Sequence, residues 1–187
     1  MDFLRNLLTK NELMASTLLV LVAVLARLIP HPPNFTPIIA IALFSGHILT
    51  KSNKVIGYLI PLIIMFIADL FIGFYSTIIY VYLSIFIISI IGKRSHLFKS
   101  PKETTLTSTI GSILFFLITN TAVWFHSEMY SKTITGLWSC YVMAIPFFHN
   151  TLISTLTFMG VIWITYTFSL KQLERESVSE NIRNKKH

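Results

Sequence analysis

The sequence contains little charge and almost no cysteine. Charged residues make up only 12% of the 187 residues, whereas apolar residues make up 53%. An average soluble domain has about 25% charged residues, and a domain of this size could not remove so much apolar surface from water. The shortage of charge, together with 13% aromatic residues, also excludes a disordered chain. Because Cys140 is the only cysteine, a disulfide-stabilised secreted fold is excluded as well.

The sequence also lacks the short motifs that identify many enzymes. It has no Walker A motif, no Gly-x-Gly-x-x-Gly, no Gly-x-Ser-x-Gly and no His-Glu-x-x-His. His31, His126, His149 and Cys140 are possible metal ligands, but none has the spacing of a metal site, and no base adjoins Cys140 in the sequence. We therefore predict no catalytic residue, no metal site and no cofactor, so uptake against a gradient would need energy from elsewhere.

Long apolar runs are what the sequence does have, and they predict an all-α, polytopic membrane protein. Six runs cover residues 13–29, 36–50, 55–75, 76–92, 106–125 and 143–168. A membrane-spanning helix needs about 20 apolar residues, and these runs do not alternate as barrel strands would. The predicted parts are an N-terminal segment at 1–12, a six-helix transmembrane domain at 13–168, and a polar tail at 169–187.

The basic residues predict the orientation of the chain. If all six runs cross the membrane, all but two of the 15 basic residues lie on one side with both termini; the exceptions are Arg27 and Lys132. This bias is typical of the cytoplasmic side, so the net charge of +7 indicates membrane topology rather than nucleic-acid binding. Two alternatives stay open: the short second run is re-entrant or interfacial, or the first run is a signal peptide cleaved near Ala26.

Several polar side chains are predicted to lie at a similar depth, near the outer ends of four helices. Counted at about 1.5 Å per residue, Arg27, Asp69, Asn120 and the pair of His149 and Asn150 all lie within about two turns of an outer end. Polar groups are costly inside a membrane, so those that are present need a reason. Opposite charge and shared depth predict that Arg27 and Asp69 are close together.

The outer connections add rigid and aromatic residues to this layer. Residues 30–37 carry four prolines, which fix the backbone and make this connection a stiff cap. The predicted connection of residues 126–142 is rich in aromatic residues. Aromatic side chains over a few convergent polar groups are typical of a ligand pocket. The predicted ligand-binding residues are Arg27, Asn34, Asp69, Asn120, Trp124, Tyr130, Trp138, His149 and Asn150.

For each of these residues, a purely structural role is the alternative. Tyr and Trp near the membrane surface commonly form an aromatic belt. Arg27 can extend to lipid headgroups or form a purely structural ion pair with Asp69. Asn120 and Asn150 can bond one helix to another. The prediction of a pocket therefore depends on the shared depth of these side chains and not on any one of them.

Three stretches carry a resemblance to known proteins. They are RLIPHPPNFTPIIAIALFSG at 27–46, ADLFIGF at 68–74, and TNTAVW at 119–124 with AIPFFHNT at 144–151. Together they resemble a family of uncharacterised bacterial six-helix inner-membrane proteins, over residues 27–158. That family is similar in turn to the substrate-binding (S) components of energy-coupling-factor vitamin transporters.

The resemblance implies a bacterial inner-membrane protein that captures a vitamin-like small molecule from the outer side. It also implies a transmembrane coupling subunit with two ATPases as partner. S components commonly dock that partner through an Ala-x-x-x-Ala pattern on the first helix, which this sequence lacks; Ala42 and Gly46 form a small-residue pair on the second run instead. A solitary uptake protein is the alternative.

Three functions are compatible with these features. The leading hypothesis is a binding or uptake component for a small molecule, embedded in the lipid bilayer. The second is a scaffold or assembly subunit without a small ligand, in which the polar side chains would face separate neighbours. The third is a membrane enzyme that uses His149 or Asp69 as acid or base. We predict that the protein is not an enzyme.

Overall fold

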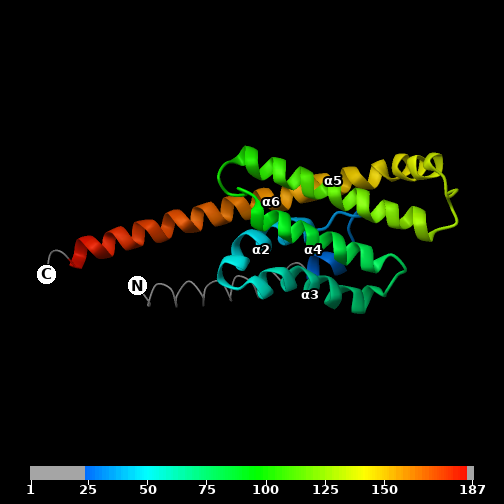
Figure 1. Cartoon of the computed structure of the whole chain (residues 1–187). Coiled ribbons are helices and arrows are strands. Elements are labelled where there is room, and N and C mark those ends of the chain that lie inside the picture. Colours follow the sequence, from blue (N-terminus) through cyan, green and yellow to red (C-terminus); the bar gives the residue numbers. More distant parts are fainter. Residues whose placement is uncertain (1–23, 185–187) are drawn as a thin grey trace.

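The computed structural model describes residues 24–184, and every regular element in that range is a helix. A short helical segment at residues 24–28 precedes the five long helices (Figure 1), which are α2 (Ile38–Ser52), α3 (Lys54–Ile72), α4 (Ile78–Arg94), α5 (Pro101–His126) and α6 (Ile134–Asn184). The predicted all-α class is confirmed for this part of the chain. Most of the first predicted span, 13–29, and all of the N-terminal segment 1–12 lie outside the described residues.

Three of these helices are long and apolar enough to cross a membrane. They are Lys54–Ile72, Pro101–His126 and the Ile134–Phe168 portion of α6. Large apolar side chains such as Phe71 and Ile79, each 73% exposed, point outward from the helices. Such surfaces are stable in lipid but not in water, so the prediction of a membrane protein is confirmed at this level.

Local sequence explains where the helices begin. The side chain of Asn53 accepts hydrogen bonds from the backbone N–H groups of Val55 and Ile56 and so caps α3. Ser100 accepts from the N–H of Glu103 and caps α5, whose first residue is Pro101. Ser and Asn are favoured caps because they satisfy N–H groups that have no partner inside the helix.

The shortest helix, α2, lies at the centre of the bundle. Ile38, Leu43 and Ser45 are at most 3% exposed, and α2 packs against α3, α4, α5 and α6. Its closest approach is to α4 at two glycines. A Cβ atom on Gly46 would lie 1.9 Å from the carbonyl oxygen of Ser89, and one on Gly92 would lie 2.3 Å from that of Leu43. The small-residue pair Ala42 and Gly46 therefore packs inside the protein.

The helices alternate in direction, which places the connections at two opposite ends of the bundle (Figure 1). At one end, His47 Nδ1 is 3.1 Å from the carbonyl oxygen of Gly92, so the ends of α2 and α4 adjoin. At the other end, the hydroxyl of Tyr80 is 3.1 Å from Nε2 of His126, so the start of α4 adjoins the end of α5. The α2–α3 and α4–α5 connections share the first end, which we call the basic end because Lys51, Lys54, Lys93, Arg94, Lys99 and Lys102 lie there.

The sixth helix differs from the prediction at both of its ends. It begins at Ile134 rather than near 143, so the predicted aromatic connection of 126–142 shrinks to residues 127–133. The hydroxyl of Thr133 accepts a hydrogen bond from the N–H of Gly136 and caps the new start. The prediction that Trp138 and Tyr141 lie in a loop is therefore wrong. The helix also continues beyond residue 168 as far as Asn184.

Candidate functional site

Arg27 and Asp69 form the ion pair that the sequence predicted. Nη2 of Arg27 donates to Oδ1 of Asp69 at 2.8 Å, and Nη1 lies 2.9 Å from the sulfur of Met65. The hydroxyl of Tyr82 donates to the second carboxylate oxygen at 2.9 Å. Asp69 is fully buried and the side chain of Arg27 is 14% exposed. Three parts of the chain, the 24–28 segment, α3 and α4, therefore meet at one carboxylate.

This network gives both oxygens of the carboxylate a partner but, in the part of the chain that the structure describes, leaves part of the guanidinium unused. Both oxygens of Asp69 accept hydrogen bonds, and the positive charge of Arg27 is compensated at close range. Nε of Arg27 is buried without a partner among residues 24–184. A buried pair of this kind is costly to break. Tyr82 was missed because its hydroxyl lies inside the fourth apolar run, where only the fold shows its partner.

Asn34 and Asn150 belong to the contact between the proline-rich connection and α6. Nδ2 of Asn150 donates to the carbonyl oxygen of Pro33 at 3.0 Å. The next residue, Asn34, is exposed and has φ of 62°, a left-handed conformation that asparagine tolerates better than most residues. These two side chains shape the connection and anchor it to α6.

Asn120 lies where α5 contacts α6, but its side-chain amide forms a hydrogen bond within its own helix. Nδ2 donates to the carbonyl oxygen of Phe116 at 2.8 Å, while the backbone oxygen of Asn120 accepts from the thiol of Cys140 at 3.4 Å. One residue further on, the hydroxyls of Thr121 and Tyr141 are 2.6 Å apart. The polar contacts between the two helices are thus made by the Cys140 thiol and by the hydroxyls of Thr121 and Tyr141, and not by the side-chain amide of Asn120.

Trp124 holds the α5–α6 connection in place. Its indole N–H donates to the carbonyl oxygen of Ser131 at 2.8 Å. Nζ of Lys132 donates to the carbonyl oxygens of Trp124 and Ser127 and lies 5.9 Å from the centre of the Trp124 ring. A cation is favourable at the carboxyl end of a helix, where carbonyl groups have no helical partner. The connection is therefore folded back onto the end of α5.

The remaining predicted residues are not brought into a common site. Tyr130 is half-buried on the α5–α6 connection, whereas Trp138 is 69% exposed and His149 is exposed, both on α6. Of the nine predicted residues, the structure joins Arg27 directly to Asp69, and it brings Asn150 to the backbone beside Asn34. The others contact their own helix or the adjoining connection, or lie at the surface.

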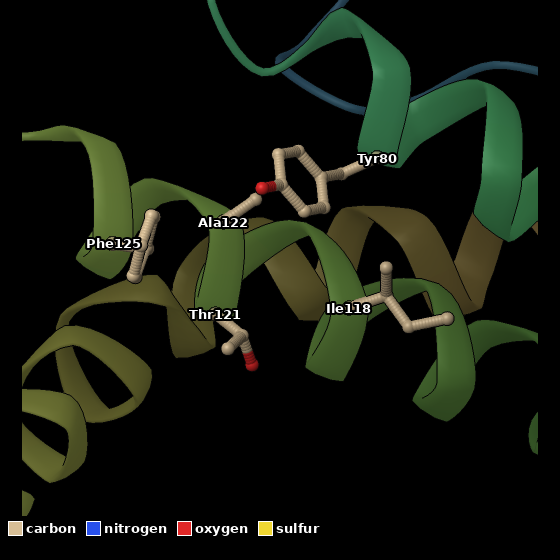
Figure 2. A pocket seen from close by; sticks show the side chains of 5 residues that line it. All are labelled: Tyr80, Ile118, Thr121, Ala122 and Phe125. Atoms are coloured by element: carbon tan, nitrogen blue, oxygen red, sulfur yellow. The ribbon is translucent and has the colours of Figure 1, made fainter.

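A cavity does lie at this end of the bundle, between α4 and α5. It has a volume of about 340 Å³ and is lined by Tyr80, Ile118, Thr121, Ala122 and Phe125. Figure 2 shows the ring of Tyr80 extending from α4 towards the face of α5 that carries Ala122. None of the nine predicted residues lines this cavity, although Asn120 and Trp124 are sequence neighbours of its wall. Tyr80 lies in the first turn of α4. A search for tyrosine hydroxyls at the same depth as the predicted polar side chains would have found it.

Few polar groups line this cavity. The Tyr80 hydroxyl contacts His126, and Thr121 is bonded to Tyr141. The other lining side chains are apolar, so the cavity suits a small, mostly apolar molecule with a hydrogen-bonding group near Tyr80. Among the described residues, no cluster of histidine, cysteine and carboxylate side chains could hold a metal ion.

Comparison with known proteins gives one match. The family model of DUF6580, a family of unknown function, matches residues 8–177 of the chain. No curated protein and no solved structure matches the chain.

Proposed function

The chain belongs to the DUF6580 family, and from its own geometry we propose that it is a multi-pass membrane protein that binds a small, mostly apolar molecule at its outer end and takes part in its uptake. The observation that carries the proposal is the cavity of about 340 Å³ between α4 and α5. Its volume lies within the range of small-molecule sites. Beside it lies the α5–α6 connection, which is held in place by Trp124 and Lys132.

We propose six spans, in the inner membrane of a bacterium, with both termini in the cytoplasm. Three helices have the length and apolarity of spans, and α2 and α4 alternate with them in one bundle. At 15 residues, α2 is about 22 Å long and shorter than the roughly 30 Å hydrocarbon layer. Protein surrounds α2, however, so it need not match the thickness of the lipid. The basic end corresponds to the cytoplasmic side.

The orientation is tested by labelling single cysteines on whole cells. In a variant that lacks Cys140, an impermeant thiol reagent is expected to label a cysteine at position 131 but not one at position 95. Ser131 lies on the exposed α5–α6 connection and Ser95 follows α4 at the basic end. Lysed cells provide the control, because both positions should then react. Labelling at 95 and not at 131 would overturn the orientation.

The outer cavity is tested by filling it. Ile118→Trp places a large ring at the cavity wall and is expected to abolish the co-purification of a small molecule, measured by native mass spectrometry of the detergent-solubilised protein. Leu117→Trp is the matched control, because Leu117 is the neighbouring residue of α5, is 43% exposed and does not line the cavity. We expect the wild type and Leu117→Trp to carry the same additional mass.

A smaller change separates binding from folding at the same site. Tyr80→Phe removes one hydroxyl, and we expect the bound fraction to fall because a hydrogen bond contributes roughly 0.5–1.5 kcal/mol. Thermal unfolding in detergent should be nearly unchanged, since this hydroxyl is at an exposed position. Equal occupancy in the wild type and Ile118→Trp, or a wild type that never carries a small molecule, would contradict the proposed site and favour a scaffold role.

Uptake against a gradient would also need a source of energy outside this chain. The sequence has no nucleotide-binding motif, so a transmembrane coupling subunit with ATPases, or an ion gradient, would have to supply it. The small-residue pair Ala42 and Gly46 is buried within the bundle, so a coupling partner would dock on another helix.

A further inference from the structure

A second cavity lies at the basic end of the bundle, away from the proposed ligand site. It is a groove of about 200 Å³ between the start of α5 and the middle of α6. Both helices contribute polar and apolar side chains to it, among them Pro101, Thr105, Ser108, Leu156, Gly160 and Trp163. Nothing in the proposed uptake function uses this groove.

Two hydrogen-bonding groups in this groove have no partner. The hydroxyl of Ser108, on a fully buried residue, and the indole N–H of Trp163 are both buried, and neither makes a hydrogen bond within residues 24–184. Buried polar groups in proteins nearly always have a partner. Because the indole can only donate and the hydroxyl can donate, the missing group is a hydrogen-bond acceptor.

The shape of the groove restricts what can supply that acceptor. A space of about 200 Å³ suits a single acyl chain better than a helix, one turn of which is about 10 Å wide and 5.4 Å high. A Cβ atom on Gly160 would meet no other atom within 4 Å, which leaves the α6 side of the groove open. A thin, flexible, apolar chain fits a space of this kind.

The depth of the groove and the charge beside it indicate which molecule has both a hydrogen-bond acceptor and a thin apolar chain. Ser108 is the third residue of the apolar run 106–125, which we propose spans the hydrocarbon, so it lies near the boundary with the headgroups. Lys99, which precedes α5, and Lys102, in its first turn, are both exposed at this end of the helix. At this depth, the ester carbonyls of phospholipids are hydrogen-bond acceptors attached to acyl chains. Basic residues beside an interhelical pocket favour anionic headgroups.

We propose that this groove binds one anionic phospholipid. Its phosphate lies towards Lys99 and Lys102, its ester carbonyl accepts from Ser108 and Trp163, and one acyl chain follows the groove beside Gly160. The site is independent of the outer cavity, so the two proposals fail or succeed separately.

The site is tested with Trp163 as the reporter. Trp124→Phe and Trp138→Phe leave Trp163 as the single tryptophan, and size-exclusion chromatography checks that this variant remains folded. It is placed in phosphatidylcholine vesicles that contain a small, equal fraction of either brominated phosphatidylglycerol or brominated phosphatidylcholine. Bromine quenches tryptophan fluorescence at short range, so we expect at least twofold more quenching by the brominated phosphatidylglycerol.

Further substitutions show whether that preference comes from the groove. Gly160→Leu fills its open side, and Lys99→Gln with Lys102→Gln removes the charge above it; each is expected to remove the preference. Lys51→Gln with Lys54→Gln is the matched control, because it removes the same charge at the same end but away from the groove. Equal quenching by the two lipids, or no quenching by either because a protein segment covers the indole, would overturn the proposal. An equal effect of the two lysine pairs would overturn it as well.

Discussion

Replacing Gly46 with alanine is expected to remove most of the folded protein from the membrane. The added methyl group would lie 1.9 Å from the carbonyl oxygen of Ser89, and both the glycine and this oxygen belong to backbones of packed helices. No rotamer change can relieve such a contact, so α2 and α4 must separate. Overpacking of a core typically costs roughly 1–3 kcal/mol, and a clash between two backbones belongs at or above the upper end of that range.

The measurement is the yield and the thermal unfolding of the variant in detergent, compared with two matched substitutions. Gly160→Ala adds the same methyl group where nothing lies within 4 Å, and Gly111→Ala adds it where the nearest atoms are 3.4 Å away or more. We expect Gly160→Ala to be neutral or slightly stabilising, because alanine is the better helix former, and Gly111→Ala to be tolerated. Normal yield and unfolding of Gly46→Ala would show that α2 and α4 do not pack this closely.

Removing either partner of the buried ion pair is expected to have the second-largest effect. Asp69→Ala leaves the guanidinium of Arg27 uncompensated, and Arg27→Ala leaves a fully buried carboxylate whose remaining polar contact is the hydroxyl of Tyr82. Breaking a buried pair costs roughly 3–5 kcal/mol, which corresponds to a fall in melting temperature on the order of 10 °C for a chain of this length.

The double substitution separates the pairing energy from other losses. Arg27→Ala combined with Asp69→Ala leaves no unpaired charge, so its melting temperature should fall by clearly less than the sum of the two single effects. Glu128→Ala is the control: it removes a carboxylate that is exposed on the α5–α6 connection, and no change is expected. Strictly additive losses would mean that the two charges do not interact.

The sequence was sufficient to predict the class of protein and the position of most helices. The predicted runs 55–75 and 76–92 correspond to α3 (Lys54–Ile72) and α4 (Ile78–Arg94) within a few residues. Long continuous apolar runs have few structural solutions, because a backbone in lipid must satisfy its own hydrogen bonds. The pairing of Arg27 with Asp69 was predictable for a related reason, since opposite charges at one depth in an apolar medium have few other partners.

The start of α6 shows where sequence reasoning failed. Trp138 and Tyr141 predict that residues 134–142 belong to an aromatic surface connection, yet these residues form the first turns of α6. Aromatic residues neither strongly favour nor strongly oppose a helix. Capping by Thr133 and packing against α5 therefore decide that this segment is helical. Trp138 consequently lies on the exposed side of α6 instead of over a pocket.

The sequence by itself thus determined an all-helical chain with apolar helices that can cross a membrane, the gathering of basic residues at one end, and one buried ion pair. Only the tertiary structure decided that the short α2 is the central helix, that Tyr82 completes the Asp69 site, and that the outer cavity is lined by Tyr80 and Thr121 rather than by the predicted asparagines. The physical reason is that some properties belong to a single segment, whereas others need two segments that are distant in the sequence. The apolarity and charge of a segment determine how it interacts with the surrounding lipid, and both can be recognised in that segment alone. A cavity or a close contact at a glycine depends instead on which faces of two separate helices meet. The packing of the whole bundle decides which faces those are.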